Sequence, residues 1–382
     1  MKTLAIIGAS YLQLPLVRKA KEMGLRTICF AWADGAVCAS ECDVFYPVSI
    51  VDKEKILEIC QIEHIDGITS IASDVAVPTI AYVAERMMLV GNSTSSAAKS
   101  TNKYLMRKAL HAAGVPCPKF AVVGDISELD SCIADMAFPL VVKPTDRSGS
   151  MGVTRIDDRK ALVEAVYVAI DASFCRKAIV EECIADMREV SVEGISWNGR
   201  YNMLQITDKL TTGAPHYVEL AHHQPAILTE DERSRISDIV ERGVAALEIN
   251  CGATHAELMI AADGQIYVTE IGARMGGDFI GSDLVRLSTG YDFLKGVILC
   301  ALGCFEEVAT GKDSQFSGVW FYTIATKWVR NVIENHAGDK RIVDAKLLND
   351  DTIPLTRSAD RSGYFIYQSQ SGRYCPKERE SV

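Results

Sequence analysis

The chain has 382 residues, of which 48% are hydrophobic and 24% charged, the balance of a globular protein with about two to three domains. Its net charge of −10 argues against a nucleic-acid partner held through phosphate contacts. No apolar run reaches the roughly 18 residues that a membrane span needs. The twelve cysteines include no Cys-x-x-Cys pair, so we expect a cytoplasmic protein without a membrane partner.

The first 90 residues alternate short apolar runs with helical patterns. Strands are expected at 4–8, 26–31 and 67–71, and helices at 14–23, 53–61 and 75–87. This rhythm predicts an α/β domain with a mostly parallel sheet. The first turn, residues 8–12, lacks the Gly-x-Gly-x-x-Gly spacing, which disfavours a dinucleotide site.

A second unit is expected after an amphipathic helix at 103–113 and a proline-rich break at 115–118. Its predicted strands lie at 120–123, 139–143, 153–156 and 178–182. From residue 189 to 271 the pattern changes to antiparallel strands with one helix at 230–247. A further helix and short strands at 318–326 and 363–368 follow, so the fold class is α/β with an α+β second part.

The most informative segment is a hairpin that places two carboxylates face to face. Asp263-Gly264 is a strong signal for a two-residue turn. Counting back from this turn sets Glu257 opposite Glu270, where like charges are destabilising. A cation would stabilise the pair, and hard oxygen ligands favour Mg²⁺ or Mn²⁺. The alternative is two solvated glutamates on an exposed sheet face.

A guanidinium and a glycine pair follow the second carboxylate. Arg274 offers a planar fork for a carboxylate or phosphate. Gly276 and Gly277 let the backbone approach a ligand closely, although an ordinary loop explains a glycine pair equally well.

Phosphate-binding signals occur earlier in the chain. Lys143 ends a buried strand and can supply a point charge. The next residues include Ser148, Gly149, Ser150 and Gly152, small residues whose backbone N–H groups can fold over phosphates. No Gly-Lys-Ser/Thr follows, so this is not a Walker loop, and a plain turn is the alternative.

The strand that ends in Glu181, Glu182, Cys183 and Ile184 could pair its exposed backbone with an adenine edge. Glu189 opens the next strand and could accept ribose hydroxyls. The alternative is a set of solvated acids at a strand end.

In this order, these residues resemble the ATP-grasp superfamily over nearly the whole chain. The resemblance implies a Rossmann-like domain at 1–92, a subdomain with the phosphate loop at 93–190, and a C-terminal subdomain with the metal and substrate sites at 191–382. It implies Mg²⁺ (or Mn²⁺) on Glu257 and Glu270. It also implies ATP binding by Lys103, Lys143, Ser148, Gly149, Ser150, Gly152, Glu181, Glu182, Cys183, Ile184 and Glu189.

One position departs from the family pattern. Many members carry Asn two residues after the second metal-binding Glu, where this chain has Gly272. The number of metal ions is therefore left open.

Residues 216–225 and 270–277 resemble segments of bacterial L-amino-acid (dipeptide) ligases, in the carboxylate–amine ligase branch. This resemblance implies a C–N bond-forming enzyme that makes an acyl phosphate, releases ADP and couples the acyl group to an amine. Arg274 would be catalytic and would hold the substrate carboxylate. The remaining substrate-binding residues would be Glu219, His222, Gly276 and Gly277. An exposed polar loop is the alternative for His222 and His223.

Two other functions stay open. One is a purine-biosynthesis or carbamoyl-phosphate-type ligase, and the other is a non-catalytic nucleotide-binding regulator. The partners expected are a small-molecule carboxylate and an amine. The sequence fixes neither substrate, nor the oligomeric state (a homodimer stays open), nor whether the short C-terminal tail limits activity.

Overall fold

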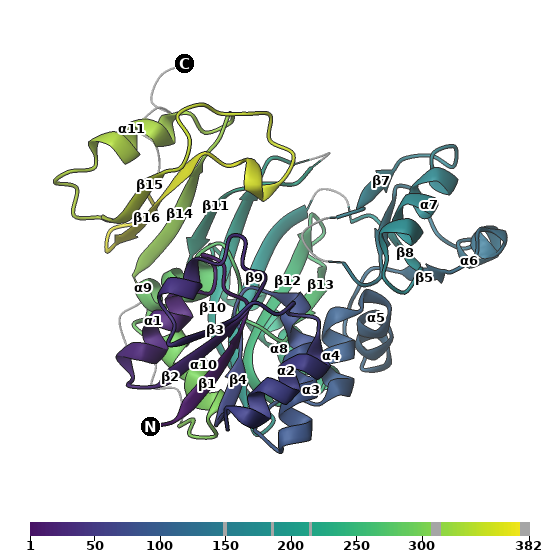
Figure 1. Cartoon of the computed structure of the whole chain (residues 1–382). Helices are drawn as coiled ribbons and strands as arrows, with labels where there is room; N and C mark the ends of the chain where they lie inside the picture. Colours follow the sequence, from purple (N-terminus) through teal and green to yellow (C-terminus); the bar gives the residue numbers. More distant parts are fainter. Residues whose placement is uncertain (148–150, 185–186, 214–215, 307–314, 375–382) are drawn as a thin grey trace.

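The protein is described by a computed structural model that covers residues 1–147, 151–184, 187–213, 216–306 and 315–374, and in these residues the strands form three sheets (Figure 1). The first sheet has the order β3-β2-β1-β4 and its strand pairs are all parallel, as the alternating pattern predicts. Its strands are β1 (Thr3–Ile7), β2 (Arg26–Phe30), β3 (Val44–Tyr46) and β4 (Gly67–Thr69), and its helices α1 (Leu14–Glu22), α2 (Lys53–Ile62) and α3 (Val77–Met87).

Two helices, α4 (Thr94–Thr101) and α5 (Lys103–Ala112), lead from this sheet to the second. Asn102 caps α5 through its side chain. The second sheet is antiparallel, has the order β5-β8-β6-β7, and lies to one side of the molecule (Figure 1). It consists of β5 (Phe120–Val123), β6 (Leu140–Pro144), β7 (Thr154–Ile156) and β8 (Ala178–Glu182), with α6 (Leu129–Cys132) and α7 (Leu162–Ala172).

The third sheet is the largest and is antiparallel throughout, with the order β13-β12-β9-β10-β11-β14-β16-β15. Its strands are β9 (Met187–Trp197), β10 (Arg200–Thr211), β11 (Glu219–Gln224), β12 (Cys251–Ala261), β13 (Ile266–Gly272), β14 (Phe316–Tyr322), β15 (Ile342–Leu347) and β16 (Gly363–Ser369). The helices that follow or interrupt these strands are α8 (Glu230–Ala246), α9 (Val285–Thr289), α10 (Phe293–Ala301) and α11 (Trp328–Asn335).

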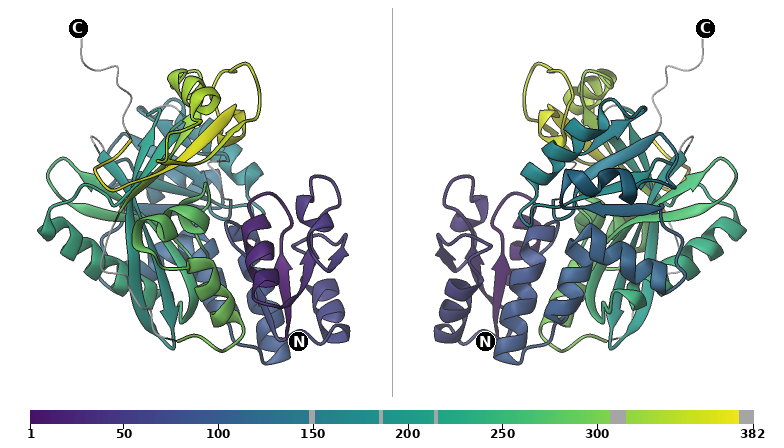
Figure 2. Two further views of the ribbon diagram at one scale, coloured as in Figure 1. Left: turned by 90° about the vertical axis from the view of Figure 1, so that its left-hand side faces the viewer. Right: turned by 90° about the vertical axis from the view of Figure 1, so that its right-hand side faces the viewer.

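The first and third sheets share one hydrophobic core. Leu4 and Leu16 of the N-terminal part pack in the same cluster as Ile195, Met275 and Phe293. Figure 2 shows the N-terminal sheet beside the large sheet. This packing brings the loops after β1 and β4 against the segment that follows β13. Among the described residues, no helix combines the length and apolar character of a membrane span.

The β12–β13 hairpin differs from the prediction at its turn. Ala261 N donates to Gln265 O (2.9 Å), so the loop has three residues rather than two, and Gly264 in it has φ +80°. A β-bulge then shifts the register between Glu257 and Leu258. The bulge cancels the error at the turn, and the predicted pairing of Glu257 with Glu270 is confirmed.

Candidate active site

One face of the large sheet is apolar and the other carries the candidate site. Val190, Val192 and Leu258 lie in the core cluster that includes residues of α8. The residues between them, Ser191 and Glu257, are paired across β9 and β12 and point to the opposite face. Period-2 alternation therefore gathers polar side chains from five neighbouring strands, β13 to β11, on one surface.

Lys209 of β10 lies at the centre of this surface and is only 4% exposed. Its Nζ lies 2.5 Å from Glu189 Oε1, 2.8 Å from Glu257 Oε1 and 3.8 Å from Glu219 Oε1. Burial disfavours its charge, but Glu257 and the other two carboxylates raise the pKa of Lys209 well above its usual range. Glu189, predicted to bind ribose, is therefore held by a lysine that the sequence analysis missed.

A second buried cation supports the same carboxylate from the other side. His255 Nδ1 contacts Glu193, and its Nε2 lies 3.4 Å from Glu257 Oε1. Burial opposes the imidazolium, but the Glu193 carboxylate outweighs it and raises the pKa of His255 to about 9. Glu193 Oε2 also accepts a hydrogen bond from Gly276 N (3.0 Å). The glycine pair is thus anchored to the site by its backbone.

The opposed pair Glu257 and Glu270 fits a divalent cation by its donor chemistry. Glu257 Oε1 is engaged by Lys209 and His255, and Glu270 Oε2 lies 3.3 Å from Lys103 Nζ. In the described residues, the other oxygen of each carboxylate has no partner. No group of three or more His, Cys, Asp or Glu side chains suited to a metal occurs in the part of the chain that is described. Two protein carboxylates, completed by phosphate and water, match the way Mg²⁺ binds.

The charge balance points the same way. Ion pairs connect three cations with five carboxylates in one network, leaving an excess of two negative charges. Its members are Lys209, His255 and Arg361, and Glu189, Glu193, Glu219, Glu257 and Asp278. One of these two charges lies with Glu189, Glu193 and Glu257, where it favours a bound cation, and the other lies with Glu219 and Asp278.

Arg274, predicted as the catalytic residue, lies beside the pair but is already bound by a carboxylate. Its Nε and one terminal nitrogen donate to the two oxygens of Asp74 (2.8 and 2.9 Å). Burial raises the pKa of Asp74, but Arg274 outweighs it and holds that pKa below its usual range. Asp74 comes from the N-terminal part, 200 residues away. The other terminal nitrogen makes a weak contact with Met275 O (3.4 Å).

Lys143, predicted to bind phosphate, is paired with Glu181. Its Nζ lies 2.7 Å from Glu181 Oε2, and Arg107 Nε lies 2.6 Å from Glu181 Oε1, an ion pair without hydrogen-bond geometry. Glu181 is 1% exposed and Arg107 is fully buried. Burial raises the pKa of Glu181, but the two cations outweigh it and lower the pKa to about 2. Both oxygens of Glu181 are thus occupied by the protein.

The hinge after β8 keeps little free backbone. Glu182 N donates to Lys119 O and Cys183 N to Pro139 O (2.9 Å each). The Glu182 side chain accepts from Ala137 N (2.9 Å). In the described residues, Ile184 N has no partner, which leaves it open for an adenine edge.

The predicted phosphate loop is only partly described. Ser148, Gly149 and Ser150 lie outside the described residues. Gly152 has φ +68°, and a Cβ there would lie 2.9 Å from Pro144, so both conformation and space require glycine.

The predicted substrate residues Glu219 and His222 lie on β11 and are not in an exposed loop. Exposure is 1% for His222 and 7% for His223, so the loop alternative is wrong. A bulge in β11, at Leu220, turns Glu219 onto the face of Lys209 and His222. Glu219 Oε2 and Asp278 Oδ2 both accept from one nitrogen of Arg361 (2.9 and 2.8 Å). His222 Nε2 lies 3.8 Å from Asp278 Oδ2.

Six charged residues of this surface were not predicted from the sequence: Asp74, Arg107, Glu193, Lys209, Asp278 and Arg361. Lys209 had a local signal, because it lies two residues after Thr207 on a strand that alternates polar residues toward the site. Asp278 follows the predicted glycine pair directly and could have been added to it.

Comparison with known proteins places part of this site within a domain of a known family. Residues 136–283 match a family model described as "ATP-grasp domain". The alanine–anticapsin ligase of Bacillus subtilis (strain 168) is 25% identical over 245 residues, which are 59% of this chain and 51% of the relative. The chain therefore spans about half the length of the curated relatives that it matches.

Two solved structures resemble the whole fold. The L-amino acid ligase from Bacillus licheniformis has a TM-score of 0.79 at 24% identity, covering 97% of this chain and 94% of that one. The phosphoribosylglycinamide synthetase from Anaerococcus prevotii has a TM-score of 0.78 at 19% identity, with the same coverage. The mixed α/β fold expected from the sequence is thus confirmed.

Proposed function

We propose that this protein, which carries an ATP-grasp domain, is an ATP-dependent carboxylate–amine ligase that acts on amino-acid-type substrates. The observation that carries the proposal is the opposed pair Glu257 and Glu270, with Lys103 and Arg274 beside it on one polar sheet face. Carboxylates for a divalent cation and cations for phosphate are what phosphoryl transfer needs, because this chemistry depends mainly on positioning and charge neutralisation.

In the proposed reaction, a substrate carboxylate oxygen attacks the γ-phosphorus of ATP and the bond to ADP breaks. The amine then attacks the acyl carbon, inorganic phosphate leaves and the amine loses a proton. Glu257 and Glu270 would hold Mg²⁺, which would supply positive charge to the phosphates. Lys103 and Lys143 would contact the phosphates, and Arg274 would orient the substrate carboxylate.

The charge of the neighbouring substrate region favours an amino acid over a phosphorylated substrate. Arg361 faces two carboxylates, Glu219 and Asp278, so this end of the site has an excess of negative charge. A phosphate ester would be repelled there, whereas an ammonium group would be attracted. The intact Glu257–Glu270 pair argues against a regulator that has lost its chemistry.

The test is an ADP-release screen with Mg²⁺ and ATP, in which amino acids are presented singly and in pairs. Wild-type protein should release ADP only when an acid and an amine are both present. Glu270→Gln should reduce this rate by at least about 100-fold, because it removes one charged ligand of the cation. Glu241→Gln is the matched control, since Glu241 is an exposed glutamate on α8.

Two results would contradict the proposal, and a third would invalidate the assay. ADP release without any amine would point to a different reaction. Release at the wild-type rate by Glu270→Gln would remove the metal assignment. An equal loss in Glu241→Gln would show that the assay reports general damage.

A further inference from the structure

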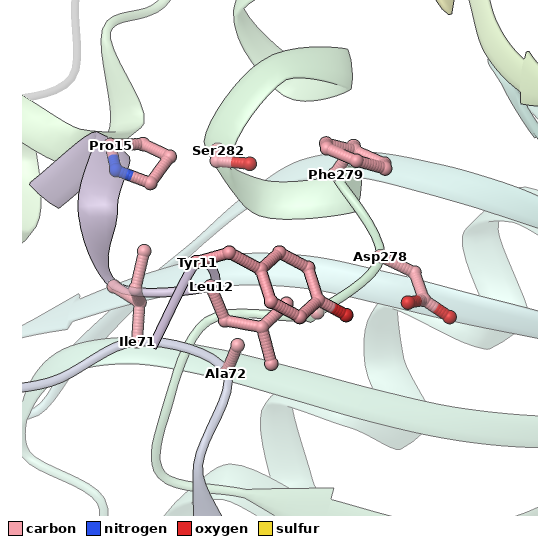
Figure 3. A pocket seen from close by; sticks show the side chains of 10 residues that line it. Tyr11, Leu12, Pro15, Ile71, Ala72, Asp278, Phe279 and Ser282 are labelled. Carbon is pink, nitrogen blue, oxygen red and sulfur yellow. The ribbon is translucent and has the colours of Figure 1, made fainter. Parts of the chain in front are cut away.

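A small pocket opens between the N-terminal sheet and the segment that follows β13 (Figure 3). Its walls are mainly apolar and include Leu12, Pro15, Ile71 and Phe279. Of its ten lining residues, Asp278 alone is charged. The Tyr11 hydroxyl points toward the Asp278 carboxylate (Figure 3). An apolar pocket with one carboxylate in its wall suits an aliphatic chain that carries a positive charge.

The Asp278 carboxylate can still accept a ligand. Its Oδ2 is bound by Arg361 (2.8 Å), but this guanidinium nitrogen is shared with Glu219. In the described residues, Asp278 Oδ1 has no partner. One cation for two carboxylates leaves a negative charge that a ligand can balance.

A neighbouring histidine gives an independent sign of a ligand. His222 is 1% exposed, and neither of its ring nitrogens has a hydrogen-bond partner among the described residues. Its Nε2 lies 3.8 Å from Asp278 Oδ2. Buried polar atoms are normally paired, and an unprotonated ring nitrogen could accept an N–H from an ammonium group bound at Asp278.

The backbone at this point is held in an unusual conformation. Asp278 has φ +49° and Phe279 has φ +68°. Two consecutive non-glycine residues in the left-handed region are costly and tend to occur at binding sites. This conformation sets Asp278 and Phe279 along the pocket.

We propose that this pocket binds the side chain of an amino-acid substrate, and that Asp278 selects side chains that end in an ammonium or another cationic group. Arg361 is a positioning residue that holds Asp278 and Glu219 in place. This inference rests on the proposed ligase function, since it names the substrate class of the same site.

The test compares lysine with norleucine, which has an aliphatic side chain of similar length without the ammonium group. In the ADP-release assay with a common partner substrate, wild-type protein should have a higher kcat/KM for lysine. Asp278→Asn should lower the lysine-to-norleucine ratio by about 10- to 100-fold, as expected for the loss of one charge-assisted contact. Asp351→Asn, at an exposed carboxylate, is the control and should leave the ratio unchanged.

Two further measurements distinguish selection from a structural role. Asp278→Glu keeps the charge and should retain the preference for lysine, whereas a merely structural Asp278 would affect both substrates equally. Calorimetric titration of lysine and norleucine, with a non-hydrolysable ATP analogue present, reports binding without turnover.

An equal kcat/KM for the two amino acids in the wild type, or an unchanged ratio in Asp278→Asn, would overturn this inference and leave the ligase proposal intact. Lysine binding that depends on Asp278 without ADP release would support the pocket and overturn the ligase. Neither binding nor turnover would overturn both.

Discussion

Lys143 allows a prediction that separates ligand binding from stability. The substitution Lys143→Met removes one of two cations from Glu181, but Arg107 Nε remains 2.6 Å from the other carboxylate oxygen. We therefore expect a stability loss limited to one charged hydrogen bond, about 1.5–3 kcal/mol. Glu181→Gln should cost more, about 3–5 kcal/mol, because it leaves the fully buried Arg107 without its carboxylate.

For the affinity for ATP the order should be reversed, so that Lys143→Met has a larger effect than Glu181→Gln. If Lys143 contacts phosphate, its loss should weaken the binding of a non-hydrolysable ATP analogue by about 10- to 100-fold, measured by calorimetry far below the unfolding temperature. Urea unfolding gives the stability of each variant, and Lys160→Met at an exposed site is the control. ATP affinity equal to the wild type in folded Lys143→Met would refute the reasoning, and so would Lys143→Met being less stable than Glu181→Gln.

Arg274→Lys should lower kcat/KM by at least about 10-fold despite keeping the charge, because Lys cannot form the two-pronged contact made to Asp74 (2.8 and 2.9 Å); wild-type kinetics would contradict this. Gly276→Ala should destabilise the protein by about 1–3 kcal/mol, since its Cβ would lie 2.8 Å from a buried imidazole nitrogen. Gly277→Ala should be tolerated, because the nearest neighbour of its Cβ would be at 3.6 Å. Equal urea midpoints for the two variants would contradict this prediction. Burial lowers the pKa of His223 from 6.5 to about 3, so the stability that depends on its neutral form is complete above pH 6.5 and is lost as the pH falls toward 3. Between pH 7.5 and 4.5, the free energy of unfolding of His223→Gln should therefore fall by about 3 kcal/mol less than that of the wild type. An unchanged pH dependence would show that His223 does not titrate in unfolding.

The sequence was sufficient where the physical signal is local. The parallel N-terminal sheet follows from the alternation of strand and helix patterns, and Glu257 and Glu270 were found because a hairpin has one dominant turn signal. That success depended on two errors that cancel, a two-residue turn in place of three residues and an unforeseen bulge after Glu257. Turn type and bulge position depend on the twist of neighbouring strands, which a single hairpin does not reveal.

The contacts that complete the site are long-range. Arg361 meets Glu219 across 142 residues and Asp278 across 83. These pairings require the strand order β11-β14-β16, which periodicity does not determine. His222 and His223 were open to a loop interpretation for the same reason, because only strands on both sides of β11 make them buried.

The Asp74–Arg274 pair suggests how the N-terminal part contributes to the chemistry. A guanidinium bound at two of its nitrogens cannot rotate freely, so Asp74 fixes the plane in which Arg274 presents its remaining donor. That donor makes only a 3.4 Å contact with Met275 O and is the part left for a substrate carboxylate. Because Asp74 reaches the site through the core shared by the first and third sheets, substitutions in that core should alter KM and kcat without touching any ligand. In the proposed function, the N-terminal part would therefore contribute to the active site through Asp74, and it also supplies Tyr11 to the pocket at Asp278.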